Sequence, residues 1–188
     1  MASSVYLSRR ARLAEALRTA GGGMALIATA PERPRNGDGD HPFRHDSSFH
    51  YLTGFDEPGA WLLLHASGEA AIGCRAKDPE REIWDGLRLG VEAAPAALGV
   101  TSAFDVEAID AVMLEALSLH SAVWFPFGTG TELPQRIDGW LATLRGRSRS
   151  GVECPSMQRD LAPLLAEMRL VKDATELDTM RRAAQISA

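Results

Sequence analysis

Apolar runs and helix-like patterns alternate along most of the chain. Three short segments are apolar at nearly every position and predict buried strands, at residues 24–29, 60–64 and 122–125. Because a strand with one wet face would alternate apolar and polar residues, these strands must be covered on both faces. Two longer segments, 105–117 and 133–144, repeat apolar residues every three or four positions and predict amphipathic helices. Together the patterns predict an α/β fold with a mixed β-sheet flanked by helices on both faces.

Both ends of the chain carry further helix signals. Near the start, Leu13 and Leu17 share one helical face before the glycines at 21–23 end the helix. This first segment is also rich in Arg and Ser, as transit peptides are, but its apolar face favours a helix of the domain. Near the other end, Asp173 and Glu176 form a capping box that opens a helix without any C-terminal signal.

The second apolar run is preceded by a segment that predicts another strand and a turn. Phe49, Tyr51 and Leu52 have high strand propensity, and residues 56–59 have the composition of a turn. Further upstream, residues 31–42 hold three prolines and two glycines and predict an exposed loop without regular structure. Loops of this length in a compact domain are usually functional or disordered.

Several short motifs follow one another in an informative order. They are PFR at 42–44, FHYLTGFDEP at 49–58, EIW at 82–84 and EMRLVK at 167–172. In this order they resemble the N-terminal domain of the Xaa-Pro aminopeptidases (aminopeptidase P), a branch of the creatinase and prolidase-like metallopeptidases. The resemblance covers nearly the whole chain. It implies a creatinase N-terminal-like three-layer domain over residues 1–172, with residues 173–188 as the start of the first helix of a C-terminal catalytic domain.

The resemblance implies that the full-length protein is an Xaa-Pro aminopeptidase, which releases the N-terminal residue before proline. Its pita-bread catalytic domain would hold two divalent metal ions, with Mn²⁺ as the expected metal, on ligands beyond residue 188. The chain itself would then be inactive, would bind no metal tightly, and would shape the substrate cleft and mediate oligomerisation. The expected partners are proline-containing peptides and further copies of the chain in a dimer or tetramer, in the cytoplasm.

The resemblance also points to three residues that would contribute to a substrate-binding site. Asp38 matches an acidic position in the predicted loop, Trp84 a tryptophan that can form an apolar wall for a proline peptide, and Arg149 a basic position that can meet a peptide carboxylate. The alternative for Trp84 is a place in the core, and for Arg149 a cation at a helix end. We predict no catalytic residue within the chain.

Two other functions stay open at this point. One is a non-catalytic, peptidase-like module that binds other proteins, and the second is the N-terminal domain of a prolidase or creatinase-type hydrolase. His41, His50 and Leu87 depart from the residues usual in the family, so the resemblance does not define the substrate contacts.

Composition and charge disfavour some classes of partner and indicate the cellular compartment. The net charge of -5 and the pI near 5.5 disfavour nucleic acid as a partner. No apolar run reaches the ~18 residues of a membrane span, so we expect no membrane insertion. Cys74 and Cys154 lie far apart and belong to no paired motif, which predicts reduced thiols as in a cytoplasmic protein.

Candidate metal motifs fail on spacing. His41, His45 and His50 lie close in sequence but match no standard zinc pattern. Residues 36–47 imitate the start of a calcium loop, yet the glycine position holds His41 and the final glutamate position holds Ser47. The sequence therefore predicts no metal site in this chain.

Overall fold

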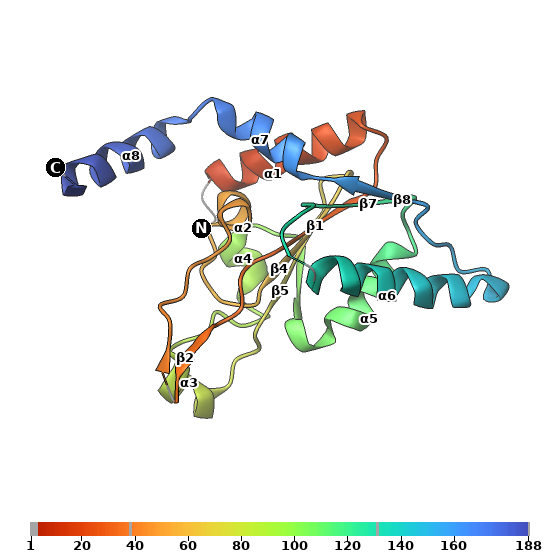
Figure 1. Cartoon of the computed structure of the whole chain (residues 1–188), viewed down its shortest axis with the longest axis horizontal. Helices are drawn as coiled ribbons and strands as arrows, with labels where there is room; N and C mark the ends of the chain where they lie inside the picture. The colour runs from red at the N-terminus through yellow and green to blue at the C-terminus, as the bar shows by residue number, and fades with distance from the viewer. Residues whose placement is uncertain (1–3, 38, 131, 188) are drawn as a thin grey trace.

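The computed structural model describes residues 4–37, 39–130 and 132–187 (Figure 1). Its centre is a six-stranded sheet in the order β6-β5-β4-β1-β7-β8. The strands of this sheet are β1 (Met24–Ala28), β4 (Trp61–His65), β5 (Ala70–Cys74), β6 (Ser102–Asp105), β7 (Ala122–Phe125) and β8 (Met157–Asp160). A small separate hairpin pairs β2 (Pro34–Asn36) with β3 (Gly39–Asp40).

Helices connect and cover these strands. The α-helices are α1 (Ser4–Thr19), α2 (Ser47–Thr53), α3 (Pro79–Asp85), α4 (Ala94–Leu98), α5 (Ile109–Leu117), α6 (Glu132–Gly146), α7 (Ala162–Leu170) and α8 (Ala174–Ser187). Two 3-10 turns, η1 (Val106–Ala108) and η2 (Ser148–Ser150), precede α5 and follow α6. The helices predicted at 105–117 and 133–144 are thus confirmed.

Strand β4 runs against the other strands of the sheet. It pairs antiparallel with β1 and β5, whereas β1 with β7, β7 with β8 and β5 with β6 are parallel pairs. The predicted mixed sheet is therefore confirmed. Because β1, β5 and β7 point the same way, the segments that follow them leave the sheet at one edge, here called the carboxyl edge.

The two faces of the sheet carry separate cores. Alternate residues of β1 divide between them: Ala25 and Ile27 pack on one side, Met24 and Leu26 on the other. Side chains of α1, α2, α4 and α7 complete the first core, and side chains of α5 and α6 complete the second. This arrangement explains why β1 and β4 are apolar at successive positions, and it confirms helices on both faces.

The strand predicted around Phe49 is wrong, because residues 47–53 form helix α2. Asp46 caps the first turn, and its Oδ1 accepts from the backbone N–H of Ser48 and of Phe49, both at 2.8 Å. Gly54 ends the helix in the left-handed conformation with φ 63°, and a Cβ there would collide with the Tyr6 ring. These two capping signals decide the conformation over the strand propensity of the aromatic residues between them.

Two further predictions need correction. The segment 31–42 is not wholly irregular, since β2 and β3 pair within it. The last strand of the sheet, predicted near Val152, lies five residues later as β8, where it pairs in parallel with β7. The strands β2 and β3 pair only with each other in a local hairpin, whereas pairing with β7 across the central sheet, rather than local propensity, places β8.

Two buried arginines of α1 connect the helices that cover the first face. Arg10, only 3% exposed, donates to the carbonyl oxygens of Leu52, Leu98 and Gly99 at 2.7–2.8 Å, and so caps the C-terminal ends of α2 and α4. Arg9 donates to the Tyr51 carbonyl oxygen and to the Asp173 carboxylate. The predicted capping box is confirmed, because Asp173 and Glu176 exchange backbone-to-carboxylate hydrogen bonds at 3.0 and 2.9 Å.

Candidate functional site

Two excursions project from the carboxyl edge of the sheet. The β2–β3 hairpin follows β1, and α3 follows β5, so both lie at the lower end of the molecule in Figure 1. An ion pair of 3.5 Å between Glu32 and Arg75 joins the bases of the two excursions. We call residues 31–37, 39–41 and 75–89 together the edge arm.

Helix α3 presents apolar side chains to solvent. Asp78 caps it through the Arg81 N–H, and Pro79 occupies its first turn, as expected for this sequence. None of its residues is buried, and Ile83, Trp84 and the nearby Leu87 are 77%, 86% and 88% exposed. The core position considered for Trp84 is therefore wrong, and the indole is free to contact a ligand or another chain.

Charged groups beneath α3 stabilise the edge arm internally and attach it to the turn before β4. The Arg88 side chain is 9% exposed and donates to the Ala76 carbonyl oxygen at 3.1 Å and to Asp85 at 3.2 Å. Glu57, from the turn before β4, accepts from the backbone N–H of Leu89. The arm is thus attached through polar contacts at its base, while its apolar tip is left uncovered.

The predicted substrate-binding residues do not gather in one place. Arg149 lies exposed in η2 after α6, and α6 leads the chain back from the carboxyl edge to the opposite edge, where β8 begins. Trp84 lies on the edge arm, and Asp38 lies outside the residues that the structure describes. Within one copy of the chain, Trp84 and Arg149 therefore occupy opposite edges of the sheet.

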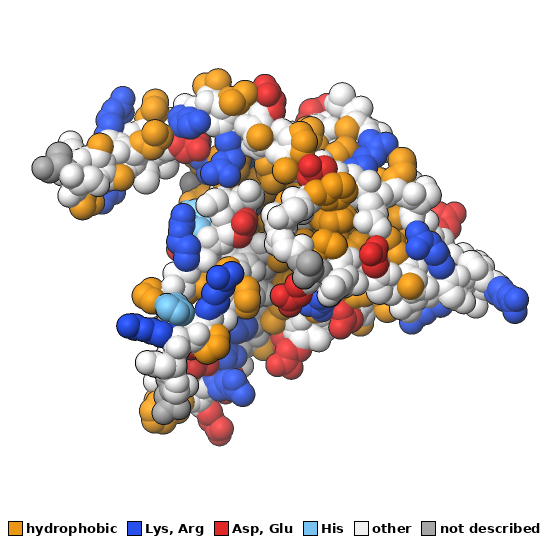
Figure 2. Space-filling view, viewed as in Figure 1, with side chains coloured by type: hydrophobic (Ala, Val, Ile, Leu, Met, Phe, Trp, Pro, Cys, Tyr) orange, Lys and Arg blue, Asp and Glu red, His pale blue; other side chains and the backbone are white. Residues whose placement is uncertain are grey.

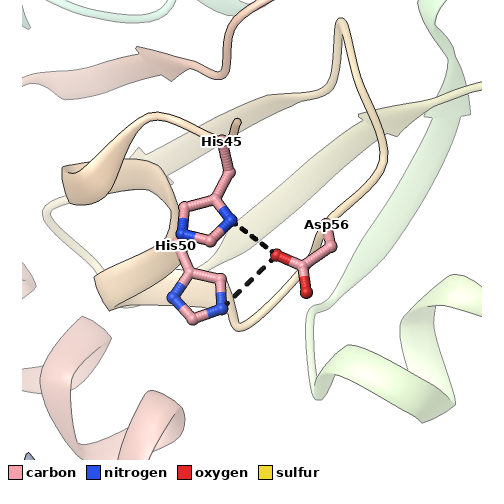
Figure 3. Close-up of side chains that lie close together, drawn as sticks. All are labelled: His45, His50 and Asp56. Carbon is pink, nitrogen blue, oxygen red and sulfur yellow. Dashed lines mark ion pairs between the residues drawn. The ribbon is translucent and has the colours of Figure 1, made fainter. Parts of the chain in front are cut away.

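A cluster of two imidazoles and a carboxylate lies beside α2 (Figure 3). His45 precedes the helix, His50 lies within it, and Asp56 follows its C-cap. Asp56 Oδ1 lies 2.8 Å from His45 Nδ1 and 3.4 Å from His50 Nε2, so both rings point to the same oxygen. The two rings stack with centroids 4.0 Å apart. Burial lowers the pKa of His50, and the nearby charges of His45, Arg44 and Arg9 lower it further against the opposing effect of Asp56.

Sequence spacing did not reveal this cluster. The three histidines were compared with zinc patterns as a set that included His41, but the structure replaces His41 with Asp56 as the third member. Asp56 joins because α2 is a helix: its nearly two turns and the C-cap bring residue 56 back toward residue 45. If residues 49–53 formed an extended strand, residues 45 and 56 would lie much farther apart.

A second histidine pair lies at the opposite edge. His65 Nδ1 and His120 Nε2 are 2.7 Å apart and join the end of β4 to the segment before β7. Burial lowers the pKa of both rings, so the pair is neutral near neutral pH. A hydrogen bond between two imidazoles then requires one ring to donate and its neighbour to accept.

Comparison with known proteins shows the family. A family model described as the N-terminal domain of aminopeptidase P matches residues 6–124. The chain is 36% identical to the Xaa-Pro aminopeptidase of Escherichia coli K12 over 187 residues, which are 97% of the chain and 42% of that protein. The chain belongs to the aminopeptidase P N-terminal domain family.

Further relatives agree with this membership. The Xaa-Pro aminopeptidase of Haemophilus influenzae is 40% identical over 166 residues, 87% of the chain and 36% of that protein. Among solved structures, Escherichia coli aminopeptidase P in its low-pH form superposes with a TM-score of 0.91 at 33% identity, over 99% of this chain and 43% of that one. Pseudomonas aeruginosa aminopeptidase PepP superposes with a TM-score of 0.87 at 37% identity, over 97% and 42%.

These relatives are more than twice as long as the matched region. The chain spans about two-fifths of their length, so the comparison concerns the aminopeptidase P N-terminal domain and its three-layer fold. In the described part of the chain, no helix is both long enough and apolar enough to cross a bilayer.

Proposed function

We propose that this aminopeptidase P N-terminal domain is the non-catalytic part of a metal-dependent aminopeptidase that releases the residue before proline. The observation that carries the proposal is the 36% identity to an Xaa-Pro aminopeptidase over 97% of the chain. A second support is the match to Escherichia coli aminopeptidase P with the inhibitor Pro-Leu, at a TM-score of 0.90 and 33% identity. We take the protein to be cytoplasmic, in keeping with its free thiols.

The metal centre of the reaction would lie outside this domain. A pair of Mn²⁺ ions requires several carboxylate ligands. Within the described residues, the group of three potential ligands that lie close enough together offers two imidazoles and one carboxylate, His45, His50 and Asp56. That set does not fit a two-manganese centre, so no catalytic step is assigned to this chain.

We further propose that residues 1–172 are one domain and that residues 173–188 begin another. Helix α7 still buries Leu165 and Met168 in the first core, whereas α8 buries no side chain. Met180 and Ile186 of α8 are exposed, and Figure 2 shows apolar side chains along this helix at the upper left. A face of this kind is typical of a helix that packs on a further structural unit.

The domain's contribution to substrate binding would require more than one copy. Trp84 on the edge arm and Arg149 beyond α6 lie at opposite edges of the sheet, so a single copy cannot direct both at one peptide. In a dimer or tetramer, one copy would supply the indole wall to a cleft and its neighbour the guanidinium. Asp38, which lies outside the described residues, stays a proposed contributor to substrate binding.

The proposed activity is tested with the full-length gene product and Mn²⁺. We expect release of the first residue from a peptide of four or more residues with proline second, and much slower release from an Xaa-Pro dipeptide. A folded, Mn²⁺-loaded protein that cleaves neither peptide would overturn the proposal. Preference for the dipeptide would instead indicate a prolidase.

The substrate-binding residues are tested separately from the activity. Trp84→Ala should raise KM for the longer peptide by about tenfold, the loss of roughly 1.4 kcal/mol of apolar contact. Leu119→Ala is the matched control, because Leu119 is also exposed but lies after α5, away from the edge arm. Arg149→Gln is compared with Arg145→Gln, which changes another exposed arginine four residues earlier, in α6. Equal KM values in each pair would exclude these roles.

A further inference from the structure

Three potential metal ligands meet on a rigid part of the fold. His45, His50 and Asp56 each offer one atom, and the three atoms lie within 4.8 Å of one another. Helix α2, which carries His50 and connects His45 to Asp56, is capped at its start by Asp46 and at its end by Gly54. Because both caps fix the backbone, the ligands are brought together before any ion binds.

We propose that His45, His50 and Asp56 form a binding site for a zinc-class divalent cation, through two imidazole nitrogens and one carboxylate oxygen. The site is separate from the two-metal centre of the proposed peptidase activity and does not depend on it. Two imidazoles with one carboxylate suit Zn²⁺ or Co²⁺, whereas Mn²⁺, Mg²⁺ and Ca²⁺ prefer sites built mainly from oxygen.

One of the two Asp56–histidine distances already fits a tetrahedral site. Bonds of about 2.0–2.1 Å to a tetrahedral ion place neighbouring ligand atoms roughly 3.3–3.4 Å apart. Asp56 Oδ1 already lies 3.4 Å from His50 Nε2, but at 2.8 Å it is too close to His45 Nδ1. The Asp56 side chain is 66% exposed and can move outward by this difference.

One ring must also turn. The imidazole planes lie within 13° of parallel, and a ring nitrogen binds an ion that lies in its own plane. His50 is held in the helix, whereas His45 stands in the segment before the cap, so His45 is the ring that rotates. Three protein ligands would leave the fourth position of the ion to water, as in open zinc sites.

Arg44 competes with the ion for His45. Its Nη1 lies 2.8 Å from His45 Nε2, and because a guanidinium only donates, that nitrogen accepts and the ring proton lies on Nδ1. Binding an ion through Nδ1 requires the proton to move to Nε2 and Arg44 to withdraw. Arg44 is exposed, so this contact is readily broken, and its positive charge adds repulsion toward the ion. Removing Arg44 should therefore strengthen the site.

The experiment titrates the 188-residue chain with Co²⁺ and reads the visible absorption of tetrahedral cobalt, followed by displacement with Zn²⁺ measured by calorimetry. We expect one ion per chain, with Zn²⁺ bound at least ~10-fold more tightly than Mn²⁺. His50→Phe and Asp56→Asn should each weaken binding by at least ~10-fold, and circular dichroism checks that both variants remain folded.

Two controls distinguish the site from other histidines and from surface binding. His120→Gln alters the other histidine pair and should leave the cobalt spectrum unchanged. Arg44→Gln should tighten binding several-fold, which tests the competition between its guanidinium and the ion for His45, and a stoichiometry of one ion per chain separates the site from surface association. The proposal is wrong if Co²⁺ gives no tetrahedral spectrum, if folded His50→Phe binds as the parent chain does, or if Arg44→Gln weakens binding.

Discussion

The contact of α1 with α2 and α4, here called the junction, differs from the edge arm in how charged and apolar side chains are placed. At the junction, Arg9 and Arg10 are buried and donate to backbone carbonyl oxygens of helices that are distant in sequence. In the arm, the Arg88 side chain is nearly buried and donates to a backbone carbonyl oxygen, whereas Ile83 and Trp84 of α3 are exposed to solvent. An ordinary pattern of apolar residues inside and charges outside is thus reversed in both regions. At the junction, the buried arginines stabilise the packing of the helices. In the arm, the exposed apolar residues do not stabilise the fold of a single copy.

The largest expected effect is at the junction. Arg10→Met removes the donor to Leu52, Leu98 and Gly99 and leaves buried carbonyl oxygens without partners, so the free energy of unfolding should fall by about 3 kcal/mol or more. Denaturant unfolding measures the change. Arg12→Met, at an exposed position of the same helix, should stay within about 0.5 kcal/mol. Similar losses in both variants would show that the carbonyl contacts do not stabilise the junction.

A smaller effect is expected at the end of α2. Gly54→Ala should destabilise by about 2–3 kcal/mol, because its backbone is left-handed and a methyl group would meet the Tyr6 ring. Gly59→Ala has a similar φ of 69° but no atom within 4 Å of the new methyl group, and should cost only about 1 kcal/mol. Thermal unfolding compares the two. Equal losses would mean that contact with Tyr6 is unimportant.

Cys74, at the end of β5 below the edge arm, should be inaccessible to alkylating reagents, although the apolar residues of α3 are exposed. Burial raises the pKa of the Cys74 thiol to about 11, with Glu57, Asp105 and Glu92 adding repulsion toward the thiolate. At pH 8 about one thiol in a thousand is then ionised, and alkylation of native Cys74 should accelerate roughly tenfold per pH unit up to pH 11. In a Cys154→Ser variant, Cys74 is the remaining cysteine, so mass spectrometry reports its alkylation alone. Rapid alkylation at pH 8 without unfolding would contradict burial at this position.

Low pH should destabilise the folded chain through His65 and His120, the histidine pair at the edge opposite the edge arm. Since the folded pKa values of His65 and His120 are lowered, the unfolded chain takes up protons first as pH falls below about 6.5, and stability must fall with it. We expect the Tm to drop by a few degrees between pH 7.5 and 5.5. His120→Gln should reduce this slope, whereas a slope equal to the parent's would assign the pH dependence to other groups.

The smallest effect on stability is expected at the tip of the arm. Trp84→Ala should change the free energy of unfolding by less than about 0.5 kcal/mol, because its side chain contacts mainly solvent. Trp140→Ala, which empties a buried site beside Trp61 and removes a donor to Asp110, should cost about 3–5 kcal/mol. Chemical denaturation of the two variants measures the contrast. A large loss at Trp84 would show that the arm packs against the rest of the chain.

Local sequence signals predicted much of the fold, and their failures have identifiable causes. The strand positions of β1, β4 and β7, the face of α6 and the box of Asp173 and Glu176 all rest on neighbours along the chain. The aromatic residues of α2 predict a strand by their propensity, but the caps at Asp46 and Gly54 decide for a helix. The motif order also predicted the family, which the comparisons confirm.

The sequence by itself determined the three-layer fold, since apolar periodicity records which faces must be buried whatever their partners are. Only the tertiary structure decided that Arg9 and Arg10 lie inside, that Trp84 lies outside, and that Asp56 joins His45 and His50. These outcomes depend on which carbonyl oxygens, carboxylates and rings come from distant segments. Contacts between segments that are distant in sequence do not repeat periodically along the chain, so local sequence patterns cannot predict them.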